Sequence, residues 1–80
     1  MKKKFILTDI EQLEDGVYYL ARHLWSPNAS LVMIDEDAIK CISSNGMQDK
    51  GSFNYYIGCQ FSVATSSQIK KFLTARDRFM

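Results

Sequence analysis

The chain has 80 residues, of which 46% are hydrophobic and 24% are charged, and its formal net charge is +1. We expect one compact domain over residues 1–80, because this length suits a single domain and the composition is ordinary for a globular protein. The balanced charge gives no global attraction to a polyanion, and the chain has no apolar run of about 18 residues that could cross a membrane. The three lysines near the start precede too short an apolar stretch for a secretory signal, and two cysteines are too few for a disulfide framework. The sequence therefore predicts a cytoplasmic protein.

The first segment with a definite pattern begins at Thr8. Residues 3–7 before it can form a short strand or a solvated basic tail. Thr8 and Glu11 have the spacing of a capping box, in which two side chains and two backbone N–H groups at a helix start satisfy each other. Hydrophobic residues then recur every three or four positions, so the sequence predicts an amphipathic helix over residues 9–25.

The same segment has an alternative interpretation. Gly16 costs about 1 kcal/mol inside a helix relative to alanine, and the Val-Tyr-Tyr run at residues 17–19 favours a strand. The alternative is a short helix over 9–14, a turn, and a strand over 17–25. We prefer the single helix, because the helical wheel separates apolar from polar residues better than the strand does.

Residues 30–44 are typical of a β-hairpin. Two short apolar runs flank an acidic stretch at residues 35–37 that is too polar to bury. Residues 43–52 are predicted to form one long polar loop, in which Asn45-Gly46 is a strong turn signal.

The clearest strand pattern in the chain spans residues 53–63. Every second side chain there is apolar or aromatic, which predicts a central strand with one buried face. We expect the buried row to be Phe53, Tyr55, Ile57, Cys59, Phe61 and Val63. A last helix is predicted from Thr65 to about Phe79, because residues 65–68 are good helix-capping residues.

These elements predict an α+β domain. We expect a two-layer sandwich in the order αβββα, in which two helices pack on one face of a three-stranded antiparallel sheet. The sheet becomes four-stranded if residues 3–7 add a first strand.

Candidate chemistry is sparse. His23 is the only histidine, and with Cys41 or Cys59 it could form the thiol–imidazole pair of nucleophilic catalysis. Both cysteines lie in apolar rows, where cysteine usually acts as a small hydrophobic residue. The acidic stretch 35–37 lacks the spacing and the glycine of a calcium loop, and there is no glycine-rich phosphate loop. The sequence therefore predicts a protein that is not an enzyme and needs no metal or cofactor.

The aromatic residues indicate a partner-binding surface. Tyr19, Trp25 and Tyr56 exceed what the predicted core needs, and tyrosine and tryptophan are frequent anchors of protein interfaces. We therefore expect a protein-binding module, a regulator or inhibitor of another protein. Small proteins of this kind are common among those encoded by phages and other mobile elements.

The alternative hypothesis is RNA binding through the last helix. Lys70, Lys71, Arg76 and Arg78 make that helix basic, with Asp77 as its one acid. The predicted αβββα order and the Lys70-Lys71 pair resemble double-stranded-RNA-binding domains, and the resemblance implies that these side chains contact phosphates. The chain has no Gly-Pro-x-His loop of that family.

Overall fold

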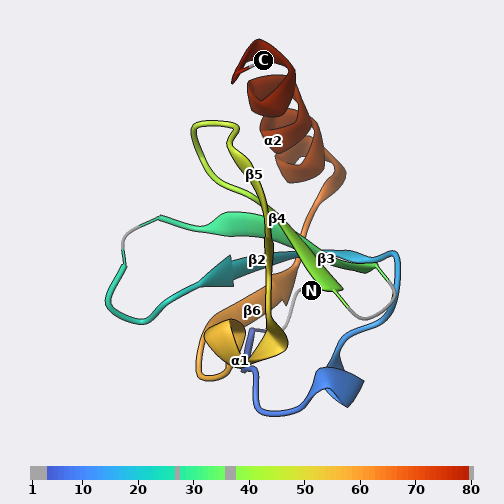
Figure 1. The fold of residues 1–80 in the computed structure, drawn as a ribbon, viewed down its shortest axis with the longest axis vertical. Helices are drawn as coiled ribbons and strands as arrows, with labels where there is room; N and C mark the ends of the chain where they lie inside the picture. The colour runs from blue at the N-terminus through green and yellow to red at the C-terminus, as the bar shows by residue number, and fades with distance from the viewer. Residues whose placement is uncertain (1–3, 27, 36–37, 80) are drawn as a thin grey trace.

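The computed structural model describes residues 4–26, 28–35 and 38–79, which fold into one antiparallel sheet with helices on both faces (Figure 1). The sheet has six strands in the order β1-β6-β2-β3-β4-β5. The strands are β1 (Phe5–Ile6), β2 (Tyr18–Arg22), β3 (Ser30–Asp35), β4 (Ala38–Ile42), β5 (Gln48–Gly51) and β6 (Gln60–Val63). The helices are a 3-10 helix η1 (Ile10–Gln12), the one-turn α1 (Phe53–Tyr56) and α2 (Ser66–Phe79).

The predicted fold class is wrong. The sheet has six strands and not three or four, and α2 is the one long helix in the described chain, where the αβββα order required two. Three segments account for the difference: residues 17–25 contain a strand, residues 48–51 form a strand, and residues 53–56 form a helix.

β2 lies where a single amphipathic helix over residues 9–25 was expected. It pairs with β6 on one side and with β3 on the other, so its backbone is satisfied by the sheet along its length. Before it come η1 and a turn at Asp15-Gly16, where the Gly16 N–H donates to the Ile34 carbonyl at 3.2 Å. The alternative of a short helix, a turn and a strand is therefore the one observed.

The cap of the first helical turn is one residue later than expected. Asp9 is the N-cap, and its side chain accepts a hydrogen bond from the Glu11 N–H. The Gln12 side chain accepts a hydrogen bond from the Asp9 N–H, which completes the capping box. Thr8 takes part through its backbone N–H, which donates to Gln12 Oε1 at 2.7 Å.

The expected central strand over residues 53–63 is interrupted. Its first part is α1, and a turn follows in which Gly58 has φ +89°, a conformation that favours glycine. Within the expected buried row, Cys59 and Phe61 are buried, whereas Tyr55, Ile57 and Val63 are exposed. The segment that becomes β6 is a strand as expected, but within it only Phe61 of the expected row is buried.

The hairpin prediction for residues 30–44 is confirmed by β3 and β4, which pair in antiparallel register from Leu31↔Ile42 to Asp35↔Ala38. Glu36 and Asp37 of its acidic turn lie outside the described residues. The expected loop over 43–52 instead contains β5, a polar edge strand. An edge strand tolerates charged side chains, which also discourage pairing with another chain.

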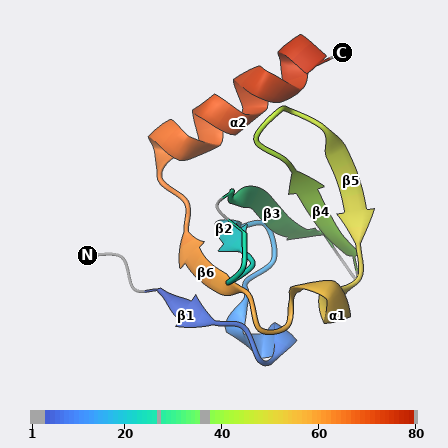
Figure 2. The same cartoon turned by 90° about the vertical axis from the view of Figure 1, so that its left-hand side faces the viewer.

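The two faces of the sheet carry separate apolar clusters. On the outer face, Leu31 and Ile42 pack with Ile69, Phe72 and Leu73 of α2, and Figure 2 shows α2 lying across that side. The inner face carries the larger cluster, which is closed by the segment around η1 and by α1. The buried residues of that cluster are Leu7, Leu13, Tyr19, Ala21, Val32, Ile34, Ile39, Tyr56, Cys59 and Phe61.

No helix in the described part of the chain combines the length and the apolar character that crossing a bilayer requires.

Candidate binding pocket

The inner face of the sheet is filled at one end and hollow at the other. Tyr19 and Ile34 fill the first end, and the ring of Phe61 packs beside Tyr19. At the other end the inner-face side chains are small, since Ala21 pairs with Ser30 across β2 and β3. The small residues form the floor of a pocket of about 730 Å³, a size typical of ligand sites in proteins. The pocket is hollow there because the side chains of Ala21 and Ser30 are small.

Aromatic rings form one wall of this pocket. His23, which follows β2, stacks on Trp25 with ring centroids 4.8 Å apart and an interplanar angle of 16°. Tyr55 of α1 meets the same imidazole edge-on at 4.8 Å, and Tyr56 lies parallel to it at 6.3 Å. We call these four residues the aromatic wall.

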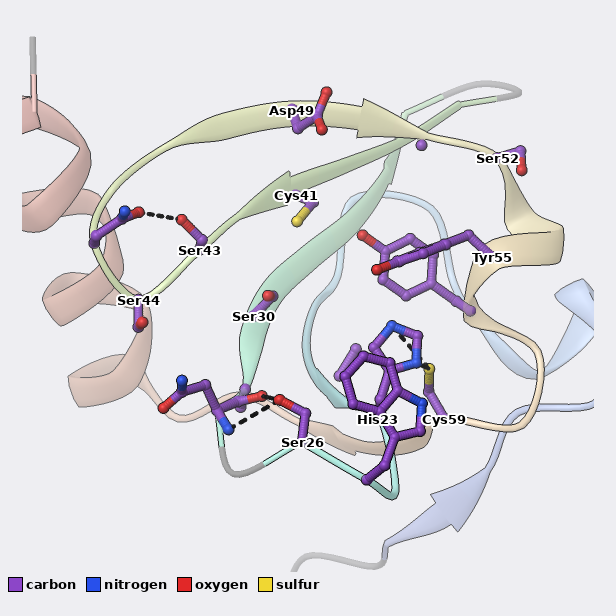
Figure 3. Close-up of a pocket in the computed structure, with 17 residues that line it drawn as sticks. His23, Ser26, Ser30, Cys41, Ser43, Ser44, Asp49, Ser52, Tyr55 and Cys59 are labelled. Carbon is purple, nitrogen blue, oxygen red and sulfur yellow. Dashed lines mark hydrogen bonds between the residues drawn. The ribbon is translucent and has the colours of Figure 1, made fainter.

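α1 brings both tyrosines to the pocket. It links β5 to β6 and lies against the inner face (Figure 2). Tyr56 can approach β5 because residue 51 is glycine: a methyl group there would lie 3.3 Å from Tyr56 Cε2, closer than most such contacts. Tyr55, at the preceding position of α1, lies with its ring roughly perpendicular to the His23 imidazole (Figure 3).

The side chain of Cys59 contacts the imidazole of His23. The Cys59 Sγ lies 3.0 Å from His23 Nδ1, within hydrogen-bonding distance (Figure 3). The structure therefore forms one of the two thiol–imidazole pairs that the sequence allowed. Burial raises the pKa of the Cys59 thiol, so the neutral form is favoured.

The Cys59–His23 pair has the composition of a nucleophile and base but not their usual setting. The thiol residue is only 1% exposed, and its backbone N–H already donates to the Tyr56 carbonyl, so it is not free to stabilise an oxyanion. The imidazole is positioned by the rings of Trp25 and Tyr55. This arrangement favours a role in fixing the aromatic wall.

Tyr56 connects the wall to the second cysteine. Burial, together with a hydrogen bond to the Cys41 side chain, raises the pKa of the Tyr56 phenol well above its ordinary value. The phenol therefore keeps its proton to a higher pH than a free tyrosine does.

The rest of the lining is polar and nearly uncharged. Hydroxyl groups come from Ser26, Ser30, Ser43, Ser44 and Ser52, and amides from Asn28 and Asn45. Asp49 of β5 is the one formally charged residue among the described residues that line the pocket. Its Oδ1 accepts a hydrogen bond from the Lys50 N–H at 2.8 Å, which orients the carboxylate.

The three aromatic residues predicted to bind a partner lie in different environments. Trp25 is 80% exposed at the mouth of the pocket. Tyr56 is 5% exposed but lines the pocket from within. Tyr19 is also 5% exposed and belongs to the filled end of the inner face, where its hydroxyl accepts a hydrogen bond from the Glu14 N–H at 3.0 Å.

Sequence reasoning missed Tyr55 as a pocket residue, and it gave the pairing of His23 with Cys59 as one of two possibilities without favouring it. Tyr55 fits the alternating pattern of residues 53–63 and was assigned to a buried row. The available signal was Gly58, because a glycine inside a strand pattern often marks a break or bulge. The His23–Cys59 contact spans 36 positions in the sequence, and no local pattern indicates it.

The basic residues of the last helix do not share one surface. Arg76 lines a hollow on the outer face of the sheet, and its guanidinium lies 3.4 Å from Asp77 Oδ1. Lys71 and Arg78 line a different hollow, beside the turn between β4 and β5. Lys70 is exposed.

Comparison of the chain with protein-family models, with curated proteins and with solved structures gave no significant match. Within the described ranges, no three His, Cys, Asp or Glu side chains are grouped so that they could hold a metal ion.

Proposed function

We propose that this protein is a non-enzymatic binding module that recognises another protein through the mouth of the inner-face pocket. The observation that carries the proposal is the exposure of Trp25, whose ring is 80% accessible and yet fixed in orientation by its stack on His23. Tyr55 beside it is 60% exposed. Leu24, which precedes Trp25, and Ile57, two residues after Tyr55, are exposed as well.

Trp25 and Tyr55 offer rigid aromatic surface to a partner. Large apolar rings exposed beside a concave site are typical of interaction surfaces. Trp and Tyr are effective anchors because they bury a large area while losing few rotatable bonds. Here the rings of Trp25 and Tyr55 both contact one imidazole, which is itself hydrogen-bonded to Cys59, so part of the ordering cost of binding is already met in the free protein.

The experiment compares capture of partners by immobilised wild-type protein and by Trp25→Ala and Tyr55→Ala, each with and without nuclease. Ile6→Ala is the matched control, since Ile6 is an exposed hydrophobic residue on β1, away from the pocket lining. We expect the affinity for a purified partner to fall about tenfold or more in each pocket variant, as for interface anchors, and to be unchanged in Ile6→Ala.

The stability of the variants must be measured alongside. Trp25→Ala should unfold at nearly the wild-type urea concentration, because an exposed side chain contributes little to the core. A partner that binds Trp25→Ala and Tyr55→Ala as tightly as wild type contradicts the proposal.

The RNA hypothesis depended on a resemblance in element order, and the described chain does not have the order αβββα. Arg76 also lies over a different surface from Lys71 and Arg78. The nuclease in the capture experiment tests that hypothesis directly: a partner retained only without nuclease would support nucleic-acid binding. We therefore keep the protein-binding proposal.

A further inference from the structure

We propose that the pocket accepts an arginine side chain of the protein partner, inserted beside the aromatic wall. This inference rests on the proposed function, because it names the group that the partner would present. Three features of the lining carry it: the aromatic rings, the single carboxylate and the many oxygen acceptors.

The aromatic wall favours a planar cation. Guanidinium groups stack on the faces of Trp and Tyr rings, where the negative face of the π system attracts the charge. Trp25 offers a largely exposed ring at the mouth, and Tyr56 lies parallel to His23 deeper in the pocket. A flat group can therefore stack on the exposed ring of Trp25 at the entrance.

The charge of the lining has one sign. Asp49 is its only formally charged described residue, and no lysine or arginine is among the described residues of this lining. Asp49 also borders the outer-face hollow, which Lys50 and Arg76 line. The carboxylate is held by the Lys50 N–H on the β5 wall. The Lys50 side chain belongs to the opposite face of β5, because alternate residues of a strand point to opposite sides and Lys50 pairs with Lys40 on the outer face.

The oxygen atoms of the polar lining suit a ligand that has hydrogen-bond donors and no acceptor. Arginine carries five N–H donors and no acceptor, and the serine hydroxyls of the pocket can accept hydrogen bonds. Lysine offers fewer donors and is more strongly hydrated, so it stacks less well. The pocket volume of about 730 Å³ exceeds one side chain and leaves room for the residues on either side of the arginine.

The test uses the capped peptide acetyl-Gly-Arg-Gly-amide and follows the fluorescence of Trp25, the single tryptophan of the chain. The matched probe is the same peptide with citrulline, which keeps the shape and removes the charge. We expect saturable quenching by the arginine peptide and binding about fivefold weaker for citrulline, as for loss of one exposed charge pair. Lysine and tyrosine peptides complete the set, and both should bind more weakly than arginine.

Two variants test whether Asp49 is the carboxylate that attracts the arginine peptide. Asp49→Asn should reduce the affinity for the arginine peptide about fivefold and leave that for the citrulline peptide unchanged. Asp77→Asn, on the exposed side of α2 and outside the pocket, should leave both affinities unchanged.

Absence of saturable quenching, equal binding of the citrulline peptide, tighter binding of the tyrosine peptide, or an unchanged arginine affinity in Asp49→Asn would each overturn the inference. None of these results touches the proposed function, which fails separately if Trp25→Ala and Tyr55→Ala retain a captured partner.

Discussion

Gly46 is a turn residue that is nevertheless buried, because its backbone packs directly against α2. Its φ is +96°, and a Cβ built there would lie 2.2 Å from the Ala75 carbonyl oxygen. The contact joins the turn between β4 and β5 to the helix that covers the outer face. Asn45-Gly46 was identified from the sequence as a turn signal, and the structure adds a packing reason for the glycine.

Alanine substitutions at Gly16 and Gly46 separate backbone strain from steric overlap. Gly16→Ala places a side chain at φ +78° with no atom within 4 Å, so it should cost about 1–2 kcal/mol for the left-handed conformation alone. Gly46→Ala should cost about 1–3 kcal/mol more, because its overlap is with backbone that cannot rotate away. Urea unfolding of both variants measures the difference, and equal losses would contradict the Gly46–Ala75 contact.

At the scale of elements, α2 depends on a cap supplied by the segment that leaves β6. The Thr65 Oγ1 accepts a hydrogen bond from the Gln68 N–H at 3.1 Å, and the Thr65 N–H donates to Gln68 Oε1 at 2.8 Å. This reciprocal pair is a capping box, and it satisfies two donors at the helix start. The cap fixes where α2 begins and therefore which of its residues face Leu31 and Ile42.

We predict that Thr65→Ala lowers the free energy of unfolding by about 1 kcal/mol, the usual effect of losing a helix N-cap. Thr74→Ala is the matched control: the same substitution at an exposed position inside α2, where alanine has the higher helix propensity. It should leave stability unchanged or slightly raised in the same urea titration. A loss in Thr74→Ala as large as that in Thr65→Ala would mean that the cap contributes nothing.

At the scale of the whole molecule, the inner cluster encloses two groups that ionise only at high pH. Burial raises the pKa of the Cys59 thiol, and burial with the Cys41 hydrogen bond raises that of the Tyr56 phenol. In the unfolded chain these groups lose their protons near pH 8.5 and pH 10 respectively. Above those values the folded state binds more protons than the unfolded state, so stability falls as pH rises.

We therefore predict that the urea midpoint declines between roughly pH 8.5 and pH 11, and that Tyr56→Phe makes the decline above about pH 10 less steep. The comparison uses slopes, because losing the hydrogen bond to Cys41 also changes the stability at neutral pH. Tyr55→Phe, which removes a phenol of an exposed ring, serves as the control. Identical slopes for Tyr56→Phe and wild type would show that the Tyr56 phenol is not the group responsible.

Local sequence patterns determined the elements whose stabilising contacts are close in the chain. The β3–β4 hairpin has its two strands joined by a short turn, and α2 carries its cap and its apolar stripe within one segment. Phe61 was correctly expected in the core: it is 0% exposed, with the rings of Phe5 and Tyr19 about 6 Å away. These features follow from periodicity and capping, which neighbouring residues express.

Only the tertiary structure decided β2, α1 and the pocket. Tyr19 pairs with Val32 on one side and with Val63 on the other, and these distant partners make residues 18–22 a strand although their spacing also suits a helix. The pocket requires His23 to meet Cys59 and Tyr55 through α1, whose residues alternate as a strand would. Helical and strand periodicities report which side chains are apolar, but the competition between them is resolved by hydrogen-bond partners that lie tens of residues away.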